Sequence, residues 1–302
     1  MVGHLPVGAD RYDTGAAGLM ERIGTVEELV APAKLTLELR IAGTRPDGYH
    51  ELEAEMVSLD LADRIYVGPG DGLVIEADLA TPGDANPAPV RISAGPDNLV
   101  AQALAAVDRR ASVRLVKRIP AGAGLGGGSS DAAAILRWAG SDDLGVAARL
   151  GADVPFCLRG GRARVTGIGE VLHPLPFEPR SFVLCLPPFG VDTAAVYRAW
   201  DHLRLRGDRP DPADGNDLTH AALAVEPRLA SWRDVLGEVT GRRPRLAGSG
   251  STWFVDGRLD EVGLSGRTVL ALGRQRAALV EVSTIPPQPV TSSMVPATTD
   301  RA

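Results

Sequence analysis

Alternating apolar and polar residues predict several strands in the first half of the chain. The segment 34–43 (KLTLELRIAG) alternates with a period of two, which is typical of a strand with one buried face. The segment 112–120 (SVRLVKRIP) alternates in the same way. Residues 64–77 contain two short apolar runs on either side of the turn sequence GPGDG, and this pattern predicts a hairpin.

Helical patterns lie between and after these strands. Residues 96–110 contain an Asp-Asn pair near their start and carry an apolar face at helical spacing. Residues 129–140 (SSDAAAILRWAG) begin with serines and end at glycine, so we expect a second helix there. A buried strand at 181–187 precedes helices at about 191–203 and 227–239. This mixture of strands and helices predicts an α+β fold with two lobes.

The segment PLPFEPRS at 174–181 is the best candidate for a domain boundary, because prolines and mixed charges interrupt the pattern there. We expect a cleft between the two resulting domains. The chain ends lack periodicity, and the last segment is rich in Pro, Ser and Thr, so both ends are expected to be mobile. The predicted parts are a flexible extension at 1–28, an N-terminal domain at 29–173, a C-terminal domain at 180–283 and a disordered tail at 284–302.

Composition excludes several classes of protein. With 302 residues, of which 44% are hydrophobic and 23% charged, the chain can bury a sizeable core. Its net charge of −6 argues against a nucleic-acid partner, which usually requires a basic face. No apolar run reaches the ~18–20 residues of a membrane span, and no signal peptide is visible at the N-terminus. We therefore expect a soluble, cytoplasmic protein with no membrane partner.

Lysine and cysteine are both rare. Only Lys34 and Lys117 are lysines among the 32 Lys and Arg residues, so each is a candidate for a position that arginine cannot fill. Cys157 and Cys185 lie within apolar runs, which predicts buried, reduced thiols rather than a disulfide. The histidines lack the spacing of a metal site.

The densest chemical signal is the segment IPAGAGLGGGSSDAAA at 119–134, which lies between a predicted strand and a predicted helix. Glycines let the backbone approach a ligand, and the following helix adds free N–H groups and the positive end of its dipole. Ser129 and Ser130 add hydroxyls that can cap the helix or contact a phosphate or a metal ion. The segment therefore predicts a phosphate site, whose residues are Ala121, Gly122, Ala123, Gly124, Leu125, Gly126, Gly127, Gly128, Ser129 and Ser130.

Two other phosphate-binding patterns compete with this interpretation. The pattern GxxxxGK[ST] is absent, because no lysine follows the glycines. The dinucleotide pattern GxGxxG is present from Gly122 to Gly127, and Asp142 or Asp143 stands where a ribose-binding acid is expected. However, the first strand of a doubly wound sheet is buried on both faces, whereas 112–120 alternates. A dinucleotide fold is therefore disfavoured.

The segment PAGAGLGGGSSDAA resembles the phosphate-binding motif of the superfamily of galactokinase, homoserine kinase, mevalonate kinase and phosphomevalonate kinase. Within it, DGYH and GADVPF are similar to segments of the 4-diphosphocytidyl-2-C-methyl-D-erythritol kinase family, and together they are much more specific than the glycines. Segments similar to that family follow in the expected order over about 220 residues, at 31–37 (APAKLTL), 43–52, 150–175, 216–227 and 246–254.

The resemblance implies an enzyme that uses ATP and Mg²⁺ to phosphorylate the 2-hydroxyl of 4-diphosphocytidyl-2-C-methyl-D-erythritol, in the non-mevalonate route to isoprenoid precursors. By motif position, Asp153 is the catalytic base and Lys34 stabilises charge. Ser130 is the candidate metal ligand. The domain at 29–173 then binds ATP, and 180–283 forms the C-terminal kinase domain. The choice between a monomer and a homodimer stays open.

The resemblance also implies where the substrate and the nucleotide bind. Tyr49 and His50 correspond to the cytidine site, where a tyrosine can stack on the base and a histidine can bond its polar edge. Asn98 and Lys117 resemble positions near the bound nucleotide. The remaining predicted substrate contacts are Thr36, Tyr197, Gly248, Ser249, Gly250 and Ser251.

Several of these residues also have a purely structural interpretation. Asn98 and Asp153 can cap helices, and Tyr197 can be a core aromatic residue. Family members usually carry an asparagine two residues after the catalytic lysine, whereas this chain has Thr36. Two alternatives therefore remain, a related kinase that acts on another small alcohol and a non-catalytic nucleotide-binding paralogue.

Overall fold

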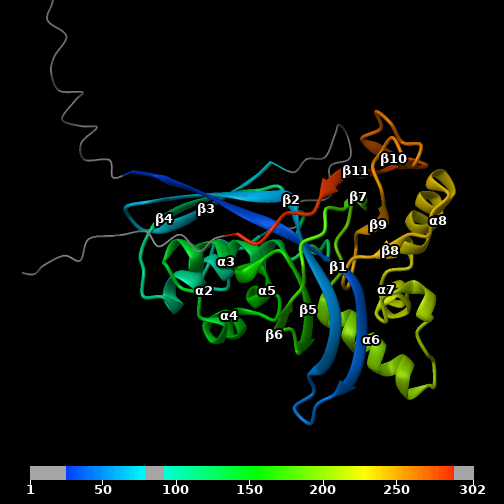
Figure 1. Cartoon of the computed structure of the whole chain (residues 1–302), viewed down its shortest axis with the longest axis horizontal. Helices are drawn as coiled ribbons and strands as arrows, with labels where there is room; N and C mark the ends of the chain where they lie inside the picture. The colour runs from blue at the N-terminus through cyan, green and yellow to red at the C-terminus, as the bar shows by residue number, and fades with distance from the viewer. Residues whose placement is uncertain (1–24, 79–91, 289–302) are drawn as a thin grey trace, which may run out of the picture.

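The computed structural model describes residues 25–78 and 92–288, and it contains two sheets with helices packed against them (Figure 1). The strand order of the first sheet is β3-β4-β2-β5-β6, and β1 pairs with β2 outside this path. Its strands are β1 (Glu27–Thr44), β2 (His50–Gly68), β3 (Gly72–Ala77), β4 (Ser112–Lys117), β5 (Arg162–Gly167) and β6 (Val171–Pro174). The helices beside this sheet are α2 (Leu99–Ala106), α3 (Gly127–Trp138), α4 (Leu144–Leu150) and α5 (Val154–Arg159).

The second sheet has the strand order β10-β11-β7-β9-β8. Its strands are β7 (Ser181–Leu186), β8 (Arg245–Leu246), β9 (Trp253–Asp256), β10 (Val269–Leu272) and β11 (Gln275–Ser283). The helical elements of this half are α6 (Thr193–Leu205), the 3₁₀ turn η1 (Pro212–Asp214), α7 (Thr219–Val225) and α8 (Arg228–Thr240). The two sheets with their own helices confirm the predicted α+β class.

The long strands β1 and β2 connect the two halves of the molecule. They pair antiparallel from Glu27↔Val67 to Thr44↔His50, and their turn reaches the region of α6 (Figure 1). The backbone of Leu39 exchanges hydrogen bonds with Gly215 and Asp217 of the second half. The hairpin therefore lays residues of the first sheet against both halves.

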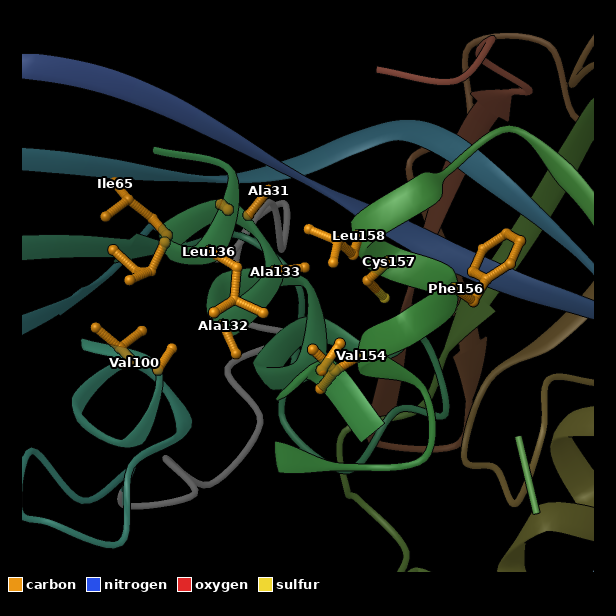
Figure 2. Packing of buried hydrophobic residues seen from close by; sticks show 14 of the residues in the cluster. Ala31, Ile65, Val100, Ala132, Ala133, Leu136, Val154, Phe156, Cys157 and Leu158 are labelled. Carbon is orange, nitrogen blue, oxygen red and sulfur yellow. The ribbon is translucent and has the colours of Figure 1, made fainter. Parts of the chain in front are cut away.

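Among the described residues, three apolar clusters form the core. One lies between the first sheet and helices α2–α5, where Ala132 and Ala133 of α3 allow close packing against neighbours such as Val100 and Leu158 (Figure 2). A second fills the space between the second sheet and α6–α8. The third contains residues of both sheets, including Leu35, Leu59, Phe182 and Phe254. Because the third cluster is shared, burial of its apolar surface joins the two halves.

One predicted strand pairing is wrong. The strands at 64–77 do not form a hairpin, because β3 pairs parallel with β4, and β4 pairs antiparallel with the end of β2. The strand that precedes the glycines therefore lies in a mixed sheet, which is unlike the doubly wound dinucleotide fold. Asp143, the alternative ribose ligand, caps α4 by accepting hydrogen bonds from Gly145 and Val146.

The chain ends differ from the prediction where they can be described. Strand β1 already begins at Glu27, within the expected extension. Thr284 and Pro287, within the expected tail, bridge to Leu59 and Gly160, so residues 284–288 pack against the first half. The rest of both predictions, at 1–24 and 289–302, lies outside the described residues.

Both cysteines, Cys157 and Cys185, are buried free thiols, as predicted, and burial raises the pKa of Cys157 to about 12. Within 25–78 and 92–288, no helix is long and apolar enough to cross a membrane.

Candidate active site

A cavity of about 930 Å³ brings together most of the predicted site residues. It is bordered by β1, by the glycine loop (residues 121–128), by the start of α5, by α6 and by the second glycine turn (residues 247–250). The predicted residues that line it are Lys34, Thr36, Tyr49, His50, Asn98, Lys117, every residue from Ala121 to Ser129, Asp153, Tyr197, Gly248 and Ser249. Residues from both halves of the sequence thus face one space.

The glycine loop presents backbone amides to this cavity. Within the described part of the chain, the N–H groups of residues 124–129 donate no hydrogen bond to another residue. The carbonyl groups point elsewhere: Gly122 O accepts from Ser251 and Val191, and Leu125 O accepts from Lys34 N at 3.0 Å. Free amides beside the N-terminus of α3 make a site suited to an anion such as a phosphate.

Only glycine fits at the centre of the loop. Gly124 has φ +77°, and a Cβ atom there would lie 2.1 Å from the carbonyl oxygen of Ala247. Gly126, the N-cap of α3, has φ +68°, and its Cβ would lie 2.8 Å from Cγ of Lys34. The loop is therefore pressed between the second glycine turn and β1.

Lys34 and Asp153 form an ion pair at the cavity wall, with 3.2 Å between Lys34 Nζ and Asp153 Oδ2. Lys34 is buried, whereas the side chain of Asp153 is 30% exposed. The Lys34 ammonium also donates to Thr36 Oγ1 at 3.2 Å. Thr36 stands at the position where family members usually carry asparagine. Because its hydroxyl accepts this bond, Thr36 orients the lysine.

Local structure explains the placement of both partners. The β1–β2 register shifts between Pro32 and Lys34 and again between Thr36 and Glu38, and such bulges re-aim side chains. Asp153 occupies the N-cap position of α5, but its side chain makes no capping bond. The helix-cap interpretation of Asp153 is therefore wrong, and its carboxylate is free to face Lys34.

Helix α5 is fixed by contacts with α3 and with the first core cluster. Arg137 of α3 is buried, and its Nη1 donates to Cys157 O at 2.6 Å. Phe156 and Leu158 of the same helix are fully buried in the first core cluster. These contacts fix the start of α5, and hence Asp153, relative to the glycine loop.

Lys117 lies in a different environment, between two buried carboxylates. Its Nζ donates to Asp131 Oδ2 at 2.6 Å and to Asp63 Oδ2, and all three side chains are nearly inaccessible. Burial opposes the charge of Lys117, but the carboxylates of Asp131 and Asp63 outweigh it and raise its pKa. Asp63 Oδ1 also accepts from the backbone N–H groups of Arg118 and Ile119.

These contacts hold both ends of the glycine loop. The amides bound by Asp63 lie just before the loop, and Asp131 lies in α3 just after it. Burial raises the pKa of Asp131 to about 7, although Lys117 opposes the shift. Its Oδ1 is buried and has no partner among the described residues.

His50 is enclosed by one face of α6. Its ring stacks on Tyr197 with 5.0 Å between centroids and an angle of 28°, and it meets Trp200 edge-on at 5.2 Å. His50 Nε2 lies 2.7 Å from Asp201 Oδ1. These three partners lie at positions i, i+3 and i+4 of one helix, so a single helix surface fixes the histidine.

The two predicted tyrosines differ in exposure. The side chain of Tyr49 borders the cavity and is 60% exposed, so its ring is accessible to a ligand. Tyr197 packs against His50, and burial together with the nearby charge of Asp153 raises its pKa. His50 therefore already covers one face of the Tyr197 ring. Tyr197 packs in part as a core aromatic residue, which was the alternative interpretation, and it also lines the cavity.

Three predicted site residues do not line the cavity. Ser130 is fully buried and its Oγ donates to Pro32 O at 2.6 Å, so the structure does not support it as a metal ligand. Ser251 is buried and its Oγ donates to Phe189 O at 2.6 Å. Gly250 donates to Ala247 O within the second glycine turn. Gly250 and Ser251 thus shape that turn rather than face the cavity.

Asn98 takes the capping role that the sequence offered as its alternative, and further residues take structural roles that the sequence did not assign. Asn98 caps α2 by accepting from Val100 at 2.8 Å while it lines the cavity. Asn216, in the segment NDLTH, is buried and its Nδ2 donates to Leu246 O and Gly248 O, so it holds the second glycine turn. Asp131 and Asp201 were also missed. The SSD motif contains Asp131, but Asp201 has no signal in its own segment.

Comparisons with known proteins agree with this geometry. Residues 98–161 match the family described as "GHMP kinases N terminal domain". The chain is 38% identical over 239 residues to the 4-diphosphocytidyl-2-C-methyl-D-erythritol kinase of Paracoccus denitrificans, covering 74% of this chain and 84% of the relative. It is also 38% identical over 252 residues to that of Dinoroseobacter shibae, covering 74% and 83%.

Solved structures give the same result. A crystal structure of 4-(cytidine 5'-diphospho)-2C-methyl-D-erythritol kinase is 31% identical and superimposes with a TM-score of 0.59 over 85% of this chain and 99% of the other. The crystal structure of L. major mevalonate kinase, at 13% identity and a TM-score of 0.55, shares the fold. With curated relatives above 30% identity and most of their length covered, the chain belongs to the 4-diphosphocytidyl-2-C-methyl-D-erythritol kinase family.

Proposed function

We propose that this chain transfers the γ-phosphoryl group of ATP to the 2-hydroxyl of 4-diphosphocytidyl-2-C-methyl-D-erythritol, a step toward isoprenoid precursors in the non-mevalonate route. One observation carries the proposal: a single cavity contains the free loop amides, the Lys34–Asp153 pair and the His50 cluster. The names of the similar proteins support the choice of substrate.

Asp153 is the catalytic base of the proposed reaction. Its carboxylate takes the proton of the attacking hydroxyl while the hydroxyl oxygen bonds to the γ-phosphorus. The bond from that phosphorus to the β–γ bridging oxygen breaks, and ADP leaves. The carboxylate is suited to this role because it is partly exposed, lines the cavity and is not used as a helix cap.

Lys34 supports this base and the transferred phosphoryl group. Its ammonium, 3.2 Å from Asp153 Oδ2, orients the carboxylate and stabilises negative charge in the transition state. Lysine suits this narrow position because its Cγ and Cε pass close to Gly126, where a flat guanidinium has less room.

The phosphates of ATP bind to the glycine loop. The backbone amides of residues 124–129 provide hydrogen-bond donors that do not depend on mobile side chains. The N-terminal end of α3 adds partial positive charge. Such fixed donors need little rearrangement during phosphoryl transfer, which depends mainly on positioning and charge stabilisation.

Mg²⁺ enters the proposal with ATP. No group of three or more His, Cys, Asp or Glu side chains suited to a metal occurs within 25–78 and 92–288. Protein-bound Mg²⁺ often uses one or two protein oxygens together with substrate phosphates, and the unpartnered Oδ1 of Asp131 and the hydroxyl of Ser129 fit that pattern. The ion would neutralise charge on the phosphates. Asp131 and Ser129 replace Ser130 as the candidate ligands.

A coupled ADP-release assay tests the proposed function. The purified chain is given ATP and Mg²⁺ with the cytidylyl substrate, and in parallel with mevalonate or homoserine. We expect turnover with the cytidylyl substrate alone. Turnover with only another alcohol would favour the related-kinase alternative, and nucleotide binding without any turnover would favour the non-catalytic paralogue.

A further inference from the structure

Asp201 is a charged residue at the cavity that the proposed reaction does not use. It lies on α6 with its side chain 43% exposed, and its Oδ1 lies 2.7 Å from His50 Nε2, within hydrogen-bond distance. It borders the same cavity as His50 and Tyr49. The partly exposed carboxylate of Asp201 therefore bonds an imidazole whose side chain is only 9% exposed.

The contact with Asp201 determines which imidazole nitrogen of His50 donates and which accepts. An ionised carboxylate only accepts hydrogen bonds, so Asp201 requires the proton of a neutral His50 to reside on Nε2. Nδ1 then carries a lone pair and accepts. Among the described residues Nδ1 has no hydrogen-bond partner, and the side chain of His50 retains only 9% exposure. Stacking on Tyr197 and the edge contact with Trp200 prevent the ring from turning freely.

An acceptor at Nδ1 distinguishes the two common pyrimidines. Cytosine carries an exocyclic amino group, which donates, at the position where uracil carries a carbonyl oxygen, which accepts. A histidine that offers a lone pair can bond the amino group, whereas it faces a second acceptor when uracil is present. Leaving buried polar groups unpaired is the strongest basis for rejecting a close analogue.

We propose that Asp201 is a specificity-determining residue: it fixes the acceptor tautomer of His50 and thereby selects a cytidine diphosphate group over a uridine diphosphate group. This inference rests on the proposed function, because it assigns the cytidylyl end of that substrate to the His50 pocket. Asp201 acts through His50 and is a positioning residue.

The first experiment compares substrates. Turnover is measured with the cytidylyl substrate and with its uridylyl analogue, and binding of CDP and UDP is measured by calorimetry. In Asp201→Ala, the ratio of kcat/KM for the two substrates should fall by about tenfold or more, and KM for ATP should stay unchanged. His202→Ala, the adjacent exposed position of α6, is the matched control and should keep the ratio.

The second experiment observes the tautomer directly. ¹⁵N spectra of the histidine rings should show His50 with its proton on Nε2 in the wild-type chain, with its signal assigned by its loss in His50→Gln. A proton on Nδ1 in the wild-type chain, or an unchanged substrate ratio in Asp201→Ala, would overturn the inference. If the wild-type chain instead fails to act on the cytidylyl substrate, the proposed function itself is wrong, and the two failures are thereby distinguished.

Discussion

Lys34 and Lys117 are the only lysines in a chain with 30 arginines, and both lie beside the glycine loop, yet their surroundings differ. Lys34 faces one carboxylate, that of Asp153, which is partly exposed to the cavity. Lys117 is enclosed by two carboxylates, Asp63 and Asp131, which are both buried. The Lys34–Asp153 pair is therefore accessible to a substrate in the cavity. The three charged side chains around Lys117 are buried and bonded to one another.

This difference in accessibility indicates a catalytic role for one ion-pair group and a structural role for the other. An ion pair at a cavity can exchange a proton and respond to a phosphate, because solvent and ligand reach it. A buried triad stabilises only when every charge is compensated, and it holds the segments that carry it in one arrangement. We infer that Lys34 acts in phosphoryl transfer, whereas Lys117 keeps the two ends of the glycine loop together.

The largest effect is expected at the accessible pair. Asp153→Asn removes the base while keeping the shape of the side chain, so kcat should fall by about 10²–10⁴-fold. ATP affinity should change little, since the loop amides remain, and it is measured by fluorescence titration or calorimetry. Retention of most of the wild-type kcat would remove Asp153 from the mechanism.

The next effect concerns stability and the buried triad. Lys117→Met leaves Asp63 and Asp131 without compensation, so the free energy of unfolding should drop by about 3–5 kcal/mol. Urea denaturation measures it. Lys34→Met is the control, and its loss should be smaller, because Asp153 can be hydrated when its partner is removed. Equal losses in the two variants would contradict the comparison.

A backbone test follows at the loop between the two lysines. In Gly124→Ala, the alanine must keep the left-handed backbone conformation of this position, with φ near +77°. Its Cβ would also collide with the carbonyl oxygen of Ala247. We expect a loss of about 2–4 kcal/mol in unfolding free energy and a raised KM for ATP. Gly128→Ala is the matched control, because its Cβ would meet only Leu99 Cδ1 at 3.6 Å. Similar behaviour of both variants would show that the loop is not tightly pressed.

The smallest effect is a difference in pH dependence. The pKa of Asp131 is raised from 3.8 to about 7 in the folded chain, so the folded state holds a proton that the unfolded state has already released. This raised pKa makes stability fall as pH rises from about 4 to 7. Relative to Asp131→Asn, the wild-type unfolding free energy should decrease by about 1–2 kcal/mol between pH 5 and 7. Parallel curves for the two proteins would show that Asp131 is already ionised at pH 5.

Sequence patterns predicted elements better than their partners. The alternation in 112–120 and the alanine-rich face of 129–140 gave β4 and α3, because local periodicity reflects which face is buried. The hairpin at 64–77 was wrong, because the strand β4, distant in sequence, pairs between its two halves. Neighbouring strands in sequence need not be neighbours in a sheet.

The same limit applies to the site. The pairing of Lys34 with Asp153 was inferred from motif resemblance, since residues more than 100 positions apart carry no local signal of contact. Ser130 was a candidate ligand from ATP chemistry and motif resemblance, and the helix was predicted to start at Ser129. It starts at Gly127, and the turn of the helix then directs Ser130 inward while Ser129 lines the cavity. Asp201 was missed because its partner His50 is 151 residues away.

The most direct test of the comparison measures phosphoryl transfer in a single turnover, at saturating ATP and cytidylyl substrate, in Lys34→Met and Lys117→Met. Both are assayed at a temperature where circular dichroism shows them folded. Lys34→Met should slow the chemical step by about 10²-fold or more, because it removes the cation that stabilises the transition state. Lys117→Met should keep a rate within a few-fold of wild type once ATP saturates. A single-turnover rate that falls equally in the two variants, or that falls only in Lys117→Met, would contradict the comparison.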